Sequence, residues 1–288
     1  MRRMGFLVET VLAVDRLFPR AALERRTSPG AYSEWEHETG RAVFTRHFGA
    51  DRLRGRRVLD AACGPAGKTA WYAEAGAALV AGVDLDRAFL LQGRAFAAAR
   101  GVADRVRFAA ADAMRLPFPD GCFDAVIATD AMEHFGDPAA ALHELARVAR
   151  PGGTVFIAFP PFRSAWGAHL YDHLRIPWCQ LLLPRRLLYA ALERSALDAE
   201  RRRDPAGAEL RARQTYLAAV DFYEHALNRM TVARFRDLVR REPRVRARRI
   251  AGVPPRVAAL APLARLPGLE ELLSGLVVAE LERLPARE

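Results

Sequence analysis

Small residues and carboxylates recur where short apolar segments end, which is the arrangement of a site for a nucleotide-like ligand. Residues 58–67 read Val-Leu-Asp-Ala-Ala-Cys-Gly-Pro-Ala-Gly and join an apolar segment to a helical one. Small side chains there let the backbone pass close to a ligand, and the N-terminus of the following helix offers free N–H groups. Asp84 ends a second apolar segment, where a carboxylate can accept hydrogen bonds from ribose hydroxyls, and Asp112 places another acceptor after a third.

The segments that must position these residues alternate between apolar and helical patterns. We expect strands at Val58–Ala61, Ala78–Val83, Val106–Ala110, Phe123–Thr129 and Val155–Phe159, and helices at Lys68–Ala75, Ala88–Arg100 and Pro138–Ala149. Fully apolar strands separated by helices predict a parallel sheet that is covered on both faces. Pro-Gly-Gly at 151–153 is expected to turn from the last helix into its strand. The pattern predicts a doubly wound α/β domain with its ligand crevice at the carboxyl edge of the sheet.

Four pieces of the sequence, in this order, are similar to one large family. They are Val58–Gly67, Gly82–Asp86, Ala111–Phe135 and Leu145–Phe159, and the most specific is Asp112–Asp120 followed by Phe123-Asp124-Ala125-Val126. Over about residues 35–160 the chain resembles the class I S-adenosylmethionine-dependent methyltransferases, the broad group that includes ubiquinone and menaquinone biosynthesis enzymes. The resemblance implies a Rossmann-like sheet, S-adenosylmethionine as the methyl donor and S-adenosylhomocysteine as the product.

The resemblance also implies which residues contact the cofactor. It places Asp60, Ala62, Cys63 and Gly64 at the methionine part, Asp84 at the ribose, Asp112 and Ala113 at the adenine, and Thr129 and Asp130 beside the sulfonium. Leu85 is a further expected cofactor contact. Ala62 and Ala66 stand where the family usually has glycine, so their methyl groups could narrow the loop. A redox dinucleotide enzyme is the structural rival, but it requires a Gly-x-Gly-x-x-Gly turn, which residues 64–67 do not supply.

The rest of the chain departs from this alternation. We expect an N-terminal helical lid segment at 1–34, the cofactor-binding core at 35–160, a helical substrate cap inserted at 161–232 after the fifth strand, and closing strands within 233–288. The apolar spacing at 4–18 predicts an amphipathic helix. This helix could pack on the main domain, cover the active site, form a homodimer or touch a membrane.

Aromatic and titratable residues are the candidates for acceptor chemistry. They are His134, His169 and His173 as general bases, and Trp166, Tyr171 and Trp178 as substrate contacts. A hydroxyl or protonated amine acceptor needs a base near pKa 7, which histidine supplies. A packed aromatic cap is the alternative interpretation of the insertion. His169, His173 and Asp172 could hold a metal, but no further ligand is in view, so no metal is predicted.

The acceptor class is narrowed by motifs that the sequence lacks. Residues 129–132 do not carry the Asp/Asn-Pro-Pro-Tyr/Phe motif of adenine-N6 enzymes, and no cysteine follows a proline as cytosine-C5 chemistry requires. We therefore expect methyl transfer to O, N or C of a small, partly apolar molecule in secondary or cofactor metabolism. An RNA or protein methyltransferase and a non-catalytic S-adenosylmethionine-binding scaffold are the alternatives.

Charge and composition limit the partners. The net charge of +10 lies mainly in residues 161–288, which carry 23 basic and 15 acidic residues, and the densest run is Arg234–Arg249. That run has no aromatic stacking platform beyond Phe235, so no specific nucleic-acid site is predicted. Only Lys68 among the 44 basic residues is lysine, which indicates a codon bias. Three cysteines and no apolar run of about 20 residues predict a cytoplasmic protein without a membrane span.

Overall fold

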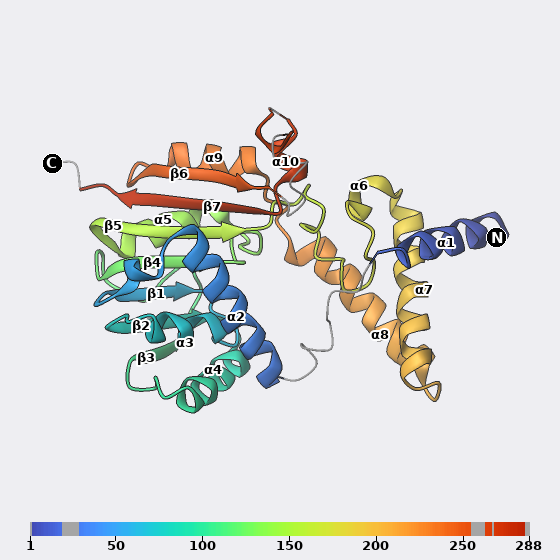
Figure 1. Cartoon of the computed structure of the whole chain (residues 1–288), viewed down its shortest axis with the longest axis horizontal. Helices are drawn as coiled ribbons and strands as arrows, with labels where there is room; N and C mark the ends of the chain where they lie inside the picture. Colours follow the sequence, from blue (N-terminus) through green and yellow to red (C-terminus); the bar gives the residue numbers. More distant parts are fainter. Residues whose placement is uncertain (1, 19–28, 255–262, 267, 286–288) are drawn as a thin grey trace. The chain divides into compact units, whose positions relative to one another are not determined.

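The computed structural model describes residues 2–18, 29–254, 263–266 and 268–285 (Figure 1). The chain divides into two compact units. The sheet unit comprises the described residues among 24–159, 232–253 and 276–288, and the helical unit comprises those among 1–23, 160–231 and 254–275. Part of the predicted N-terminal lid segment, residues 19–28, lies outside the described residues.

The sheet unit is built on seven strands in the order β3-β2-β1-β4-β5-β7-β6. The strands are β1 Arg57–Ala61, β2 Leu79–Asp84, β3 Val106–Ala110, β4 Phe123–Thr129, β5 Ala149–Phe159, β6 Val245–Val253 and β7 Leu276–Arg283. The first five pair in parallel, whereas β7 runs antiparallel to both β5 and β6. The doubly wound α/β prediction is confirmed, and the two late strands that it included close the sheet.

Helices bury both faces of this sheet. The helices of the sheet unit are α2 Pro29–His47, α3 Gly67–Glu74, α4 Arg87–Ala99, α5 Pro138–Val148 and α9 Val232–Arg241, with a 3-10 turn at Ala50–Leu53. Val58, Ile127 and Phe156 belong to one buried cluster with residues of α2, α3 and α4. Their strand neighbours, such as Leu59 and Val126, are equally buried, and alternate strand residues point to opposite faces.

One sequence-based expectation about this unit is wrong, and one helix was not predicted. The Pro-Gly-Gly segment at 151–153 lies inside β5 and does not precede it. The β4–β5 register passes from Phe123–Ala149 to Ala125–Thr154, so residues 150–153 form an irregularity within the ladder, where Gly152 has a φ of 74°. In addition, α2 was not expected, and it supplies part of the site described below.

The helical unit has its own apolar core. Its elements are α1 Arg2–Asp15, α6 Cys179–Leu182, α7 Arg185–Arg203, α8 Ala208–Asp221, a π-helical turn at Phe222–Ala226, a 3-10 turn at Leu263–Arg265 and α10 Glu270–Leu273. Val8 and Leu12 of α1 share a buried cluster with Leu188 and Leu192 of α7. Among the described residues, no helix has the length and apolar character needed to span a bilayer.

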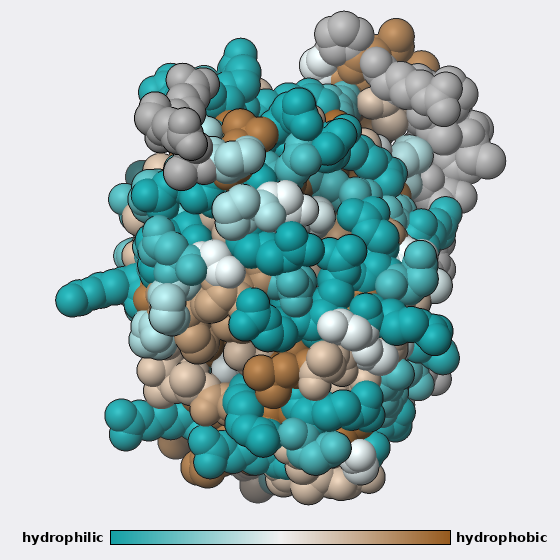
Figure 2. Space-filling model, turned by 90° about the vertical axis from the view of Figure 1, so that its left-hand side faces the viewer, coloured by the Kyte–Doolittle hydropathy of each residue, from teal (hydrophilic) through white to brown (hydrophobic). Residues whose placement is uncertain are grey.

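The side of the molecule seen in Figure 2 is mostly hydrophilic, and apolar residues gather in the lower half of this view. Thirteen of the sixteen large apolar side chains found exposed among the described residues belong to the helical unit. The three in the sheet unit are Leu85, Phe89 and Leu91, which follow β2. Exposed apolar surface in this unit is therefore concentrated after a strand that ends at the predicted ligand crevice.

Candidate active site in the sheet unit

The loop between β1 and α3 has the backbone shape of a glycine-rich turn although two of its positions are alanine. Ala62 and Ala66 have φ values of 57° and 62°, and Gly64 has 53°. A left-handed conformation costs an L-residue about 1–2 kcal/mol. Ala66 is fully buried, and a Cβ built on Gly93 of α4 would lie 2.6 Å from the Ala66 methyl carbon. The Ala66 methyl group thus faces α4, where Gly93 makes room for it, and it does not narrow the loop.

Asp84 connects this loop to the end of β2. Its Oδ2 accepts a hydrogen bond from the Gly64 N–H at 2.8 Å, and its Oδ1 accepts one from the Asp86 N–H at 2.9 Å. Asp86 in turn caps α4, because its side chain accepts from the Ala88 N–H. Leu85 is the next residue in the chain and is 70% exposed. A hydrogen-bond acceptor next to unburied apolar surface fits a nucleoside, and the ribose role of Asp84 stays a proposal.

Asp60 and Cys63 are turned into the protein. Asp60 is buried, and its Oδ2 accepts from the Thr69 hydroxyl at 2.6 Å. Burial raises the pKa of Asp60 to about 6, against the opposing effects of Thr69 and Lys68. Burial likewise raises the pKa of the Cys63 thiol well above its ordinary value. These side chains shape the loop from inside, so any contact with the methionine part would come mainly from the backbone.

Asp112 and Ala113 follow β3 as predicted. The Asp112 Oδ1 accepts from the Met114 N–H at 2.8 Å, which fixes the turn, and Ala113 is buried. Asp84 and Asp112 therefore end neighbouring parallel strands, since β2 pairs with β3. Their proposed contacts with ribose and adenine are compatible with this placement.

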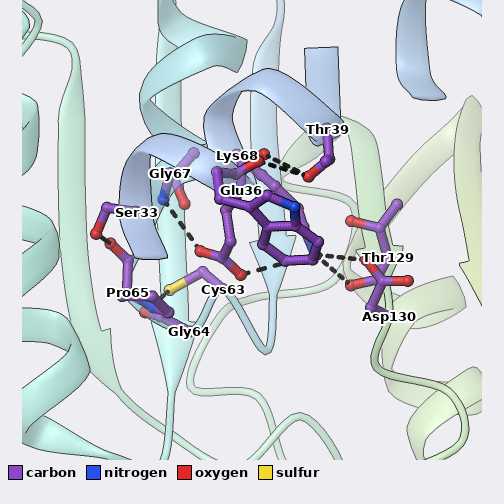
Figure 3. A network of polar contacts seen from close by, with 12 residues as sticks. Ser33, Glu36, Thr39, Cys63, Gly64, Pro65, Gly67, Lys68, Thr129 and Asp130 are labelled. Carbon is purple, nitrogen blue, oxygen red and sulfur yellow. Dashed lines mark hydrogen bonds and ion pairs between the residues drawn. The ribbon is translucent and has the colours of Figure 1, made fainter. Parts of the chain in front are cut away.

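A buried ionic network lies between α2, α3 and the end of β4, and the sequence analysis missed it (Figure 3). The Lys68 ammonium donates to the Thr129 carbonyl at 3.2 Å and to the Asp130 Oδ2 at 2.8 Å. It also lies 3.9 Å from the Glu36 Oε1. Burial lowers the pKa of Lys68, but Asp130 and Glu36 outweigh this and raise it well above its ordinary value. The ammonium is therefore charged at neutral pH.

Next to this network is a cavity of about 180 Å³. It is lined by Trp35, Thr39, Gly40, Val43, Lys68, Thr129, Asp130, Ala158 and Leu276, all residues of the sheet unit. Asp130 has a φ of 52°, a left-handed conformation that is uncommon outside glycine although aspartate adopts it more often than most residues. Such a conformation persists where surrounding contacts impose it. Here the ion pair with Lys68 is such a contact.

The three candidate histidines belong to different units. His134 follows β4 in the sheet unit, and its Nε2 lies 3.8 Å from the Glu133 Oε1. His169 and His173 belong to the helical unit, where burial lowers the pKa of His173. His173 and Tyr171 line one cavity of about 580 Å³ in that unit. Their catalytic and substrate roles stay proposals.

The two candidate tryptophans have different surroundings. The Trp178 Nε1 donates to the Leu272 carbonyl at 3.0 Å, a contact that joins two segments of the helical unit. Trp166 is 41% exposed. Trp178 therefore has a structural task of its own, whereas Trp166 presents part of its ring to the surroundings.

The geometry fits S-adenosylmethionine, whose sulfonium supplies an activated methyl group. A carboxylate at the end of β2, another after β3, a left-handed loop and an exposed apolar side chain match its nucleoside. Asp130 follows β4, the strand on the other side of β1 from β2. Residues 59–157 match the family described as a methyltransferase domain. This part of the chain is a class I S-adenosylmethionine-dependent methyltransferase domain, as the resemblance predicted.

Curated relatives share this domain. The chain is 41% identical over 108 residues to Methyltransferase GfsG of Streptomyces halstedii, covering 38% of this chain and 39% of that protein. It is 44% identical over 108 residues to the demethylmenaquinone methyltransferase of Thermus thermophilus, covering 37% and 48%. It is 38% identical over 102 residues to a probable tocopherol O-methyltransferase of Oryza sativa, covering 35% and 28%. The matched region spans less than half of each relative.

Solved structures share the fold at low sequence identity. A methyltransferase from Mesorhizobium loti has a TM-score of 0.52 at 18% identity, over 89% of this chain and 100% of that one. A geranyl diphosphate methyltransferase has a TM-score of 0.53 at 16% identity, over 86% and 79%. These likenesses show the fold alone.

Proposed function

We propose that the whole chain transfers a methyl group from S-adenosylmethionine to O, N or C of a small, partly apolar molecule in secondary or cofactor metabolism. The observation that carries the proposal is the 180 Å³ cavity beside Thr129 and Asp130. A dry cavity of about 150 Å³ holds a benzene ring, so this space suits one ring or a short chain. The relatives' names support a small-molecule acceptor, since they include demethylmenaquinone and tocopherol methyltransferases.

The residues of this cavity have distinct tasks in the proposal. Trp35, Val43 and Leu276 supply apolar walls that exclude water and orient the acceptor. The Asp130 carboxylate, held by Lys68, lies where it could accept a proton from a hydroxyl or amine acceptor. His134, His169 and His173 are further candidates for this proton, and a base contributes about 10²–10⁴ in rate when one is needed.

The alternative of an RNA or protein methyltransferase is weakened by the contacts of the basic run. Arg246 and Arg248 both bind the Glu282 carboxylate, at 2.6 and 2.7 Å. Arg241 pairs with Asp237, and Arg249 donates to the His47 carbonyl. Arginines engaged in this way offer fewer free cations to phosphates. We expect weak, salt-sensitive retention of RNA, and submicromolar sequence-selective binding at physiological salt would contradict this.

The proposal is tested by methyl transfer from labelled S-adenosylmethionine to small phenols, quinols and amines, to tRNA and to peptides. We expect turnover with small apolar acceptors only, and loss of turnover in Asp84→Ala. Turnover with tRNA or peptide would replace the proposal. Binding of the donor without turnover of any acceptor would favour the scaffold alternative. The cytoplasmic location and a homodimer stay predictions.

A further inference from the structure

Lys68 occupies a position where the chain uses a compact cation in place of its usual arginine. It is the one lysine among 44 basic residues, and its side chain is only 10% exposed. A Cβ built on Gly40 of α2 would lie 2.7 Å from the Lys68 Cγ, so the side chain passes through a narrow space that glycine keeps open. The planar guanidinium of arginine is larger and differently hydrated, so the two residues are not interchangeable here.

The Lys68 ammonium has unused hydrogen-bonding capacity. Of its three donors, one goes to Thr129 and one to Asp130. Glu36 is the next acceptor but lies at 3.9 Å, beyond hydrogen-bonding distance. Within the part of the chain that the structure describes, one N–H of this buried ammonium therefore remains for a ligand.

Glu36 contributes a buried carboxyl group to the same network (Figure 3). Its side chain is 7% exposed, and its Oε2 accepts a long hydrogen bond, 3.4 Å, from the Gly67 N–H. A Cβ built on Gly64 would lie 3.5 Å from the Glu36 Oε1, so this carboxylate borders the loop that is expected to receive the methionine part. Burial raises the pKa of Glu36 to about 7, although Lys68 opposes this.

We propose that Lys68 binds the α-carboxylate, and Glu36 the α-ammonium, of the amino-acid end of S-adenosylmethionine. This end is a zwitterion, and burying both of its charges requires opposite charges and hydrogen bonds in the site. Lys68 and Glu36 supply one of each sign, buried and adjacent, beside Gly64 and Gly67. The assignment concerns the methyl donor alone and does not depend on the proposed acceptor.

The test compares two ligands that differ in the amino-acid end. S-adenosylhomocysteine carries it, whereas 5′-methylthioadenosine keeps the nucleoside and the sulfur and lacks it. In isothermal titration of the full chain, Lys68→Met should lower the affinity for S-adenosylhomocysteine at least tenfold and change the affinity for 5′-methylthioadenosine by less than twofold. Glu36→Gln should also weaken the binding of S-adenosylhomocysteine alone, but by a smaller factor than Lys68→Met, because glutamine keeps a neutral hydrogen-bond acceptor. Asp84→Ala should weaken both ligands, since both carry the ribose.

A charge control and a second test variant keep the test interpretable. Arg41→Met makes the matched loss of one positive charge at an exposed position of α2, the helix that carries Glu36, and should leave both affinities within twofold. If Lys68→Met does not fold, Glu36→Gln decides the question alone. Equal weakening of both ligands would show that the network only supports the loop, and unchanged affinity for S-adenosylhomocysteine would show that it binds no part of the cofactor. Either result overturns the proposal.

Discussion

Gly93 of α4 and Ala66 of the loop occupy complementary space, so substitutions at the two positions should be strongly coupled. In Gly93→Ala the new methyl group would lie 2.6 Å from the Ala66 Cβ and 3.2 Å from the Phe108 Cζ. Overpacking costs about 1–3 kcal/mol, and the gain in helix propensity returns about 1 kcal/mol. The net expectation is a loss of up to about 2 kcal/mol in the free energy of unfolding.

Ala66→Gly removes the methyl group that a side chain at position 93 would meet, and it also replaces an alanine in the left-handed conformation by glycine. It regains about 1–2 kcal/mol of backbone strain, but it loses about 0.8 kcal/mol of methyl burial and about 0.4–1 kcal/mol through the freer unfolded chain. The single variant should therefore be close to neutral. In its background Gly93→Ala should become neutral or stabilising, which gives a coupling energy of about 2 kcal/mol.

The assay is urea unfolding of the four proteins of this cycle. Two compact units can unfold separately, so the transition to follow is the one that S-adenosylhomocysteine shifts. Gly30→Ala is the control for glycine replacement in a helix, because a Cβ there meets nothing within 4 Å. If the changes in unfolding free energy of the two single variants add up to that of the double variant within about 0.5 kcal/mol, as they do for distant sites, the packing of Ala66 against α4 is refuted.

Three further predictions follow from the site. Asp84→Ala should weaken S-adenosylmethionine at least tenfold in titration, because a charged hydrogen bond contributes about 1.5–3 kcal/mol, while the protein stays folded by circular dichroism; unchanged affinity would exclude a ribose contact. Between about pH 4.5 and 7 the folded parent protein keeps a proton on Glu36 that its unfolded chain releases, so the free energy of unfolding of the parent falls as the pH rises. Glu36→Gln has no such proton, so its stability should rise relative to that of the parent over this range. A pKa of about 7 in the folded state against 4.5 corresponds to a relative gain of about 3 kcal/mol in the free energy of unfolding of the variant at pH 8. Urea unfolding of both proteins at pH 5 and pH 8 measures this gain, and a stability difference that does not change with pH would contradict the raised pKa of Glu36. Once an acceptor is known, His134→Ala, His169→Ala and His173→Ala should be compared across pH 6–9, and the variant that removes the general base should lower the rate of methyl transfer about 10²–10⁴-fold. The affinity for S-adenosylmethionine is the control and should not change. Near-normal rates in all three variants would mean that the Asp130 carboxylate accepts the proton or that the reaction needs no base.

Most of the sheet could be predicted because its strands are continuous apolar segments. The expected segments at 106–110 and 123–129 agree with β3 and β4 at both ends. The carboxylates at the end of β2 and after β3 could be placed because these apolar segments end where expected, to within one residue. The start of β5 could not be found in the same way. Pro151 and Gly152 normally mark a turn, and only the neighbouring strand β4 shows that the ladder continues on both sides of them.

Helix α2 escaped prediction because the side that it buries is partly polar. Ser33, Glu36 and His37 are all buried, so hydrophobic periodicity gives a weak signal. Their partners come from distant segments: the Ser33 hydroxyl donates to the Pro65 carbonyl, and the His37 Nε2 lies 2.8 Å from the Glu74 Oε2. No local rule specifies such pairs, since each depends on where the loop and α3 lie in three dimensions.

The same buried polar residues explain why α2 belongs to the site and does not merely cover the sheet. A Cβ on Gly67 would lie 2.0 Å from the Ser33 carbonyl oxygen, so the helix is in direct backbone contact with the loop. A helix that only covered apolar surface would gain more from leucine than from a buried glutamate, whose charge is costly to desolvate. The cost is reduced when an oppositely charged ligand group arrives. The raised pKa of Glu36 and the single lysine at 68 are then two consequences of one requirement, a site that is complete only when a zwitterion is bound.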